Sequence, residues 1–433
     1  LQQAIEIEIA TIPVYLSTYY SINRVPEQGK LTKEFEKRLI EQGESQQKAA
    51  TRALDLSAKI MVFANRAGAN IMSVAVEEML HMSLSSNVKQ ALFGNPILVG
   101  KAPNVWPAYL AGHEPEFPIN RAKLSVEQLQ TFMDIESPSE LPEQSNLLKA
   151  IPYLTIGKFY EGIKNCIRDF YDNNECYHPQ RPQLVPGRGY YAQNNIDTIY
   201  YDKQHKPVYE NAANAGGLIQ VKDQASALAA LETIVEQGEG ASSIFDDGTD
   251  NELAHFYKFS QLQQELKQIT EEFKLTFGDN MDVTKHFIHN FADNAETKDY
   301  PAAIQAVSTL TNAVYSYLFI MSQACYRAEE HTQFEIFMFG IHKSMLWILS
   351  SLCGEMTSFS YISADDGQQY TATPTFEEYQ FSNASSPKSQ IIELFNQAVG
   401  AYSGISYIEQ RIHDLPNVSL AGFLEPTNTP LMA

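Results

Sequence analysis

The chain has 433 residues, of which 44% are hydrophobic, and its formal net charge at pH 7 is -21. This size allows a large buried core, built as two or three domains or as one long helical unit with insertions. The negative charge argues against nucleic acid and anionic membranes as partners, because both carry charge of the same sign. The four cysteines show no CxxC spacing, and we find no long apolar run or leader pattern. We therefore expect a soluble, cytoplasmic protein with reduced thiols.

The first helical pattern covers residues 1–22 and carries a carboxylate on its apolar side. Glu8 falls on the stripe that contains Ile5, Ile12 and Tyr15, whereas Glu6 falls on another side. A carboxylate on a buried face needs a compensating partner, so Glu8 is a candidate ligand. Residues 31–66 follow as a charged, solvent-facing helix or helix pair.

Residues 69–92 form a proline-free run that is apolar on most sides, which is typical of a helix buried on several faces. Within it, Glu78 and His81 are three residues apart and leave the same face of the helix. Glu-x-x-His on a buried bundle helix is half of the pattern that holds two iron or manganese ions in carboxylate proteins. An isolated motif of this kind is more often a buried salt bridge, so the interpretation depends on ligands elsewhere in the chain.

Two long irregular connections, residues 98–144 and 172–215, interrupt the helical pattern, and the first contains a short helix at 125–132. Between them, residues 147–171 form the third major helix. Glu161 lies at the margin of its apolar stripe, so periodicity alone places Glu161 at the surface. Residues 223–236 form an alanine-rich helix that ends in the sequence EQGEG.

A second Glu-x-x-His, Glu252 and His255, opens the helix expected at residues 251–275. His255 begins an apolar stripe, and this motif supplies the symmetric complement that a two-metal bundle requires. The remaining carboxylate stays open between Glu236, Glu239 and Glu252. Glu252 fits the spacing, but an acidic residue at a helix start also interacts favourably with the helix macrodipole.

Further helices are expected at residues 300–326, 333–356 and 387–409. We therefore predict an all-α fold, a four-helix bundle with long irregular insertions over residues 1–275 and an additional helical part over residues 276–433 packed on it. No G-x-S-x-G, G-x-G-x-x-G or Walker sequence occurs, so neither a serine hydrolase nor a nucleotide cofactor is supported.

Several segments together resemble the ferritin-like domain of iminophenyl-pyruvate dimer synthases of the violacein and indolocarbazole pathways. The resemblance covers about residues 1–265 and is carried by residues 4–16, 77–82, 87–96, 132–138, 156–162, 236–240 and 252–259. It implies a set of metal-site residues, with Glu252 held in reserve: Glu8, Glu78, His81, Glu161, Glu239 and His255. No further catalytic residue is assigned.

The resemblance implies an oxidase or oxygenase that binds two Fe or Mn ions, uses O2 as a co-substrate and acts on a small amino-acid-derived molecule in specialised metabolism. The reaction subtype stays open between hydroxylation, coupling, desaturation, N-oxygenation and halogenation. An iron-sequestering or peroxide-consuming protein and a metal-free structural partner are the alternatives. The sequence is compatible with a homo-oligomer or with a partner among the enzymes of one pathway.

Overall fold

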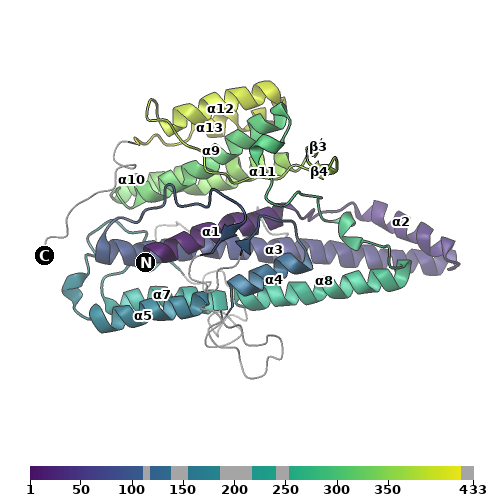
Figure 1. Ribbon diagram of the computed structural model, residues 1–433, viewed down its shortest axis with the longest axis horizontal. Helices are drawn as coiled ribbons and strands as arrows, with labels where there is room; N and C mark the ends of the chain where they lie inside the picture. Colours follow the sequence, from purple (N-terminus) through teal and green to yellow (C-terminus); the bar gives the residue numbers. More distant parts are fainter. Residues whose placement is uncertain (111–117, 138–154, 186–216, 240–252, 421–433) are drawn as a thin grey trace.

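The computed structural model describes residues 1–110, 118–137, 155–185, 217–239 and 253–420. Helices α1 (Gln2–Tyr20) and α3 (Gln46–Phe93) lie side by side and form one half of a helical bundle (Figure 1). Helix α2 (Gln28–Glu41) packs against α3. Most residues of α1 are buried, because this helix lies between the rest of the bundle and the C-terminal helices.

Four shorter helices form the other half of the bundle. They are α4 (Val126–Ile135), α5 (Ile156–Phe170), α7 (Gln224–Glu239) and α8 (His255–Phe277). Helix α4 packs against α8, and α5 packs against α7, while α7 and α8 both contact α3. Figure 1 shows the pair α5 and α7 under one end of α3 and the pair α4 and α8 under the other. Helix ends therefore meet beneath the middle of α3.

Helix α3 is longer than the sequence pattern indicated. We expected a charged segment up to residue 66 and a separate buried helix at residues 69–92, but one helix of 48 residues includes the end of the first and all of the second. The run contains no proline, and a single glycine, Gly68, is tolerated inside a helix at a cost of about 1 kcal/mol. Gly68 also makes room for Arg24, since a Cβ at that position would lie 2.6 Å from Arg24 Cδ.

The C-terminal helices form a layer over α1 and α3, on the side opposite α4 and α8 (Figure 1). Helix α9 (Ala302–Cys325) is the buried centre of this layer and packs against α12 (Pro387–Ala401). Two buried hydrogen bonds connect the layer to α3: Gln90 Nε2 donates to the Tyr326 carbonyl at 2.9 Å, and Tyr326 OH donates to the Ser83 carbonyl at 3.1 Å. After α12 the chain forms η6 (Ser403–Ile408) and α13 (Glu409–His413), and the described part ends at residue 420.

The helix expected at residues 333–356 contains two π-helical segments. It runs through α10 (Glu330–Glu335), η4 (Ile336–His342), η5 (Met345–Leu349) and α11 (Ser350–Met356), with the π geometry in η4 and η5. By length and composition alone, the stretch His331–Met356 is the one helix among the described residues that could cross a membrane. It is 56% buried within the fold, and buried core helices meet the same criterion.

Short strands and 3-10 turns complete the described structure. Strands β1 (Ala108–Tyr109) and β2 (Pro118–Ile119) pair antiparallel, with Ala108 opposite Ile119. Strands β3 (Ser360–Ile362) and β4 (Gln369–Thr371) form a second antiparallel pair. The 3-10 turns are η1 (Asn174–Cys176), η2 (Val283–His286) and η3 (Thr297–Asp299).

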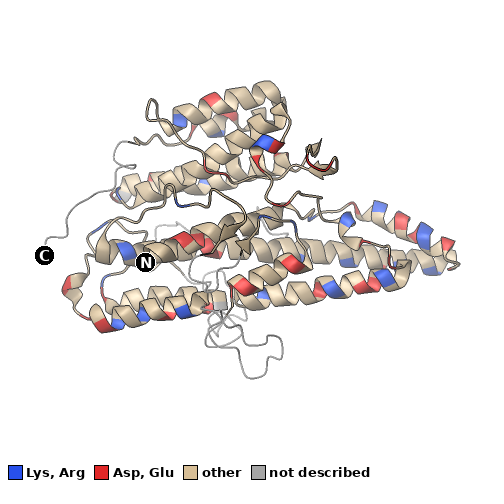
Figure 2. Cartoon of the chain, viewed as in Figure 1, with Lys and Arg blue, Asp and Glu red and all other residues tan. Residues whose placement is uncertain are grey.

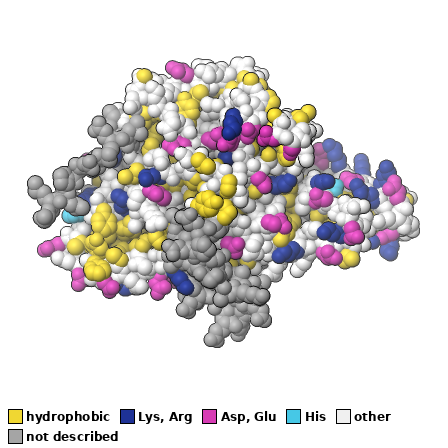
Figure 3. All heavy atoms as spheres, viewed as in Figure 1, with side chains coloured by type: hydrophobic (Ala, Val, Ile, Leu, Met, Phe, Trp, Pro, Cys, Tyr) yellow, Lys and Arg dark blue, Asp and Glu magenta, His cyan; other side chains and the backbone are white. Residues whose placement is uncertain are grey.

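Charged side chains are unevenly distributed over the molecule. Figure 2 shows Lys, Arg, Asp and Glu along α2 and α8, with few on α9 and α12. On the face seen in Figure 3, charges of both signs cover the end formed by α2, and hydrophobic side chains gather at the opposite end. Inside the bundle, by contrast, carboxylates are buried where α1 and α3 face the shorter helices.

Candidate metal centre

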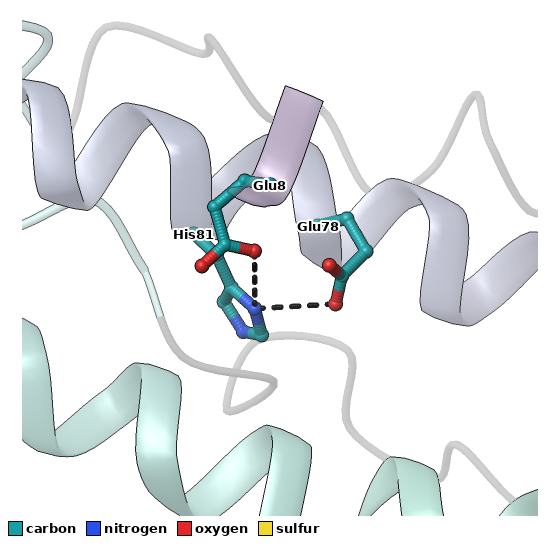
Figure 4. Close-up of side chains that lie close together, drawn as sticks. All are labelled: Glu8, Glu78 and His81. Atoms are coloured by element: carbon teal, nitrogen blue, oxygen red, sulfur yellow. Dashed lines mark ion pairs between the residues drawn. The ribbon is translucent and has the colours of Figure 1, made fainter. Parts of the chain in front are cut away.

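A buried cluster of carboxylates and histidines lies between α1, α3, α4 and α8. On one side of it, His81 Nδ1 lies 3.4 Å from Glu78 Oε1 and 3.8 Å from Glu8 Oε2 (Figure 4). All three side chains are at most 4% exposed. The two α3 residues meet because a spacing of three places them one turn apart on the same helix face, while α1 brings Glu8 across from them.

On the other side of the cluster, His255 Nδ1 lies 3.2 Å from Glu78 Oε1 and 3.5 Å from Glu136 Oε2. His255 is the first residue of α8, and Glu136 follows the last residue of α4. Within each group of three residues, the candidate ligand atoms all lie within 4.8 Å of one another. Glu78 belongs to both groups, and its Oε1 faces both histidine Nδ1 atoms, so this carboxylate would contribute to holding either ion of a pair.

Both histidines are oriented by hydrogen bonds at Nε2, the ring nitrogen that faces away from the cluster. His255 Nε2 lies 2.6 Å from Glu77 Oε2, and Lys258 Nζ donates to the same oxygen at 3.0 Å. His81 Nε2 lies 2.9 Å from Gln237 Oε1. His255 Nδ1, by contrast, is buried and makes no hydrogen bond to any residue that the structure describes. Metal-ligating histidines are held in this way, with one nitrogen bonded to the protein and the other left for the metal.

Three hydroxyl groups hold the carboxylates in place. Thr11 Oγ1 donates to Glu78 Oε2 at 2.8 Å, Tyr160 OH donates to Glu8, and Tyr15 OH donates to Glu136. Burial, followed by the neighbouring carboxylates, raises the pKa of the Tyr15 and Tyr160 phenols far above the ordinary value. Both phenols therefore stay protonated and act as donors near neutral pH.

An aromatic cluster supports the centre from the α4 and α8 side. The Tyr15 ring packs edge-on against Phe132 with ring centroids 4.7 Å apart and stacks on Phe259 at 5.4 Å, and Phe132 lies 4.9 Å from Phe259. These rings come from α1, α4 and α8, which are the helices that supply Glu8, Glu136 and His255. Each such pair contributes about 0.5–1.5 kcal/mol beyond its buried area, so the cluster fixes the helix ends on which the ligands lie.

The cluster has the protonation pattern of a site that needs cations. Burial and the Glu78 carboxylate raise the pKa of Glu8 well above its ordinary value. Burial alone would lower the pKa of His255, but Glu136, Glu77 and Glu78 outweigh burial and raise it. Burial would raise the pKa values of Glu77 and Glu78, yet Lys258 and His255 hold the pKa of Glu77 below its ordinary value, and His255 and His81 do the same for Glu78. Without metal, protons on Glu8 and His255 partly compensate the crowded carboxylates.

A small cavity of about 20 Å³ lies directly beside the carboxylates. Apolar side chains close it, including Ile156, Ile234 and Val235, and Gly238 forms part of its wall. A Cβ at Gly238 would lie 3.2 Å from Glu136 Oε2, so glycine keeps this carboxylate uncrowded. The cavity has room for a water or a diatomic molecule next to the acidic groups.

The structure brings together four of the residues singled out in the sequence: Glu8, Glu78, His81 and His255. It does not bring Glu161 to them, and the assignment of Glu161 as a ligand is corrected: its side chain is exposed on α5. The preceding residue, Tyr160, faces the cluster instead, because neighbouring residues on a helix point about 100° apart. The stripe periodicity had placed Glu161 at the surface, and the resemblance had overridden it.

The open choice between Glu236, Glu239 and Glu252 is answered only in part. Glu236 is half-buried on α7 and belongs to neither ligand group. Glu252 and the side chain of Glu239 lie outside the described part of the chain. Among described residues, the third carboxylate is Glu136, which we had not named as a candidate.

The signal for Glu136 was present in the sequence. Leu129, Phe132, Met133 and Glu136 have the spacing i, i+3, i+4 and i+7 of one helix face, and all four are buried. A carboxylate that ends an apolar stripe is the same signal that identified Glu8. The expected short helix stopped at residue 132, so the stripe was not followed to its end.

The residues present fit a pair of iron or manganese ions. Three carboxylates and two imidazole Nδ1 atoms form the mixed oxygen and nitrogen donor set that these metals accept, and Glu78 with His81 gives one of the two Glu-x-x-His pairs of di-iron and di-manganese carboxylate bundles. His255 Nδ1 faces Glu78 and Glu136 at 3.2 and 3.5 Å without a hydrogen bond to either, which is the arrangement of a ring nitrogen left for a metal.

Comparison with known proteins places this arrangement in a family. The sequence profile of the family described as Ferritin-like matches residues 1–264, which is more than half of the chain. The structure is similar to a crystal structure of a ferritin like protein from Caulobacter vibrioides, with 16% identity and a TM-score of 0.43 over 80% of this chain and 91% of that chain. No curated protein matches significantly. The predicted all-α ferritin-like fold is confirmed, and the chain belongs to the Ferritin-like family.

Proposed function

We propose that this protein is a non-haem dimetal oxidoreductase that holds two iron ions and uses O2 to oxidise a small amino-acid-derived molecule. The observation that carries the proposal is the position of Glu78, whose Oε1 lies within 3.4 Å of the Nδ1 atoms of both His81 and His255. A simple salt bridge would require only one histidine beside Glu78. Two histidines aimed at one carboxylate, each anchored through its other nitrogen, suit a pair of ions.

In this proposal the described residues hold charge, orientation and protons. Glu8, Glu78 and Glu136 neutralise the ions, and the Nδ1 atoms of His81 and His255 complete the donor set. The two ions, when bound, supply the capacity to bind and reduce O2. Glu77 and Gln237 keep the imidazole rings turned toward the centre, because each engages the opposite ring nitrogen.

The Tyr160 and Tyr15 phenols hold protons at Glu8 and Glu136, next to the apolar cavity. Tyr160 lines that cavity, so its hydroxyl is placed to donate a hydrogen bond to a small molecule there if Glu8 turns to a metal.

The resemblance of residues 1–265 to iminophenyl-pyruvate dimer synthases supports an imine derived from an aromatic amino acid as the substrate class. Oxidative coupling is the reaction that this resemblance favours. Manganese in place of iron fits the same donors.

The proposal is tested by metal analysis of protein purified without air, followed by O2 consumption with and without imines prepared from aromatic amino acids. We expect about two metal ions per chain and oxygen uptake that depends on the imine. Rapid oxidation of ferrous ion without any organic substrate would instead identify an iron-storing protein. Absence of bound metal after loading would leave only a structural role and would overturn the proposal.

A further inference from the structure

A second cavity, of about 90 Å³, lies between the bundle and the C-terminal layer. Helices α1 and α3 form its floor, and α9 together with the π-helical segments η4 and η5 forms its roof (Figure 1). It shares no lining residue with the cavity beside the carboxylates, so it is a separate site. Its lining on α3 follows the helix face that turns away from Glu78 and His81.

The lining is apolar and adaptable. Four methionines contribute to it, Met72, Met79 and Met82 from α3 and Met345 from η5. Methionine side chains have three rotatable bonds and make favourable contacts with aromatic rings, so they adjust to the shape of a ligand. Aromatic side chains of α9 and η4 complete the wall.

Three polar atoms in this lining are buried and unsatisfied. Ser86 Oγ, Tyr315 OH and His342 Nε2 have no hydrogen-bond partner among the residues that the structure describes. Ser86 is fully buried, Tyr315 is 2% exposed and His342 is 6% exposed. Buried polar groups in folded proteins are nearly always paired, and three exceptions around one apolar cavity point to a partner that the described residues do not supply.

The roof of the cavity has a backbone geometry that is rare in proteins. π-helical turns occur mostly as single turns within α-helices and are frequent at functional sites. Here η4 ends at His342 and η5 begins at Met345, and both residues line the cavity. The π-helical segments thus place the polar side chain of His342 and the flexible apolar side chain of Met345 in the lining of the same cavity.

We propose that this cavity binds a small aromatic molecule that carries one hydroxyl group, held by hydrogen bonds from the polar set Ser86, Tyr315 and His342. A phenolic hydroxyl both donates and accepts, as do the two protein hydroxyls, and it carries no charge. The described lining contains no Lys, Arg, Asp or Glu, so a neutral ligand fits better than an ion. The inference does not depend on the dimetal function, because the two cavities are separate.

The test is isothermal titration calorimetry of the full chain with phenol and, as the matched apolar probe, benzene. We expect saturable binding of phenol, about tenfold tighter than benzene, which is the worth of one hydrogen bond. The variant Tyr315→Phe removes one hydroxyl without changing the ring and should weaken phenol binding relative to benzene. Tyr317→Phe is the control, since its hydroxyl donates to the Pro416 carbonyl and does not line the cavity.

Ser86→Ala gives an independent measurement should Tyr315→Phe fold poorly, and it should also weaken phenol relative to benzene. Equal affinities for phenol and benzene in the unmodified chain would overturn the role of the polar atoms. Absence of saturable phenol binding would mean that water satisfies the three groups, and it would overturn the site. If neither variant altered the affinity for phenol, phenol would bind elsewhere, and the proposed site would be overturned.

Discussion

At the scale of single residues, the centre depends on which nitrogen of each histidine faces the carboxylates. His255 Nε2 contacts Glu77, and Lys258 holds Glu77 in turn, so Nδ1 faces Glu78 and Glu136. His81 repeats the arrangement with Gln237. The chain therefore provides an outer set of groups that orients the ligands before any ion binds, and the two carboxylates Glu77 and Glu78 have different tasks although they are adjacent.

The assignment of Glu136 in place of Glu161 is directly testable. Glu136→Gln removes a negative charge and a ligand oxygen, so we expect the bound metal to fall from about two ions to about one per chain. The affinity loss should exceed the 10–100-fold typical of groups that only orient a ligand, by about an order of magnitude or more. Glu161→Gln is the control and should bind metal like the unmodified chain, because its side chain is exposed. Metal content that falls in Glu161→Gln alone would restore the original assignment.

Metal binding should release protons and tighten as the pH rises. The pKa of Glu8 is raised by burial and by Glu78, and the pKa of His255 is raised because its carboxylate neighbours outweigh burial. Both groups must lose their protons to become ligands, so cation and proton compete. Calorimetry in buffers of different ionisation enthalpy counts the protons released. Glu8→Gln should lower the count by about one, and proton release unchanged in that variant would contradict the role of Glu8.

At the scale of elements, the long helix from Glu330 to Met356 is shaped by contacts that its own sequence does not reveal. Within η4, a Cβ at Gly340 would lie 2.7 Å from Met321 Cγ and Sδ on α9. Glycine thus allows α9 and the π-helical segment to approach closely. Gly354, in α11 of the same long helix, is exposed and has open space around it.

These two glycines form a matched pair for stability measurements. Gly340→Ala forces Met321 or the π turn to move, and it should lower the free energy of unfolding by about 1–3 kcal/mol. Gly354→Ala meets no neighbour and should raise it by about 0.5–1 kcal/mol, because alanine loses less backbone entropy in a helix. Urea denaturation measures both. A stabilised Gly340→Ala variant would show that α9 does not pack this closely on η4.

At the scale of the whole molecule, the centre connects four helices that are far apart in sequence. Glu8 comes from α1, Glu78 and His81 from α3, Glu136 from the end of α4, and His255 from the start of α8. The ends of α4 and α8 meet at this point, and bound ions would hold them together. The C-terminal layer covers α1 and α3 from the other side and encloses the second cavity.

Metal loading should therefore stabilise the folded chain as a unit. A ligand that binds only the folded state adds about 2.7 kcal/mol at a free concentration 100 times its Kd. Thermal unfolding with ferrous or manganous ion, compared with a chelator, should show a higher Tm in the loaded protein. Glu78→Gln removes the carboxylate common to both groups and should lose most of this shift. An equal shift in Glu78→Gln would show that the ions bind elsewhere.

The sequence by itself determined the helices and the part of the centre that depends on local spacing. Glu78 and His81 are one turn apart on any helix, and Glu8 lies on an apolar stripe that had to be buried, so these residues were found without a fold. A separate apolar stripe, from Leu129 to Met133, continues to Glu136. The sequence prediction ended this helix at residue 132 and so did not include Glu136.

Only the tertiary structure decided which distant groups meet. Glu136 lies at the end of one helix and His255 at the start of another, and no periodicity within either helix relates them. The rotation of α5 places Tyr160 rather than Glu161 against Glu8, and packing of that helix on α7 sets this rotation. The second cavity arises in the same way, because α1 and α3 meet segments more than 200 residues later in the chain. Local propensity describes each helix alone, whereas a site between helices depends on how they pack.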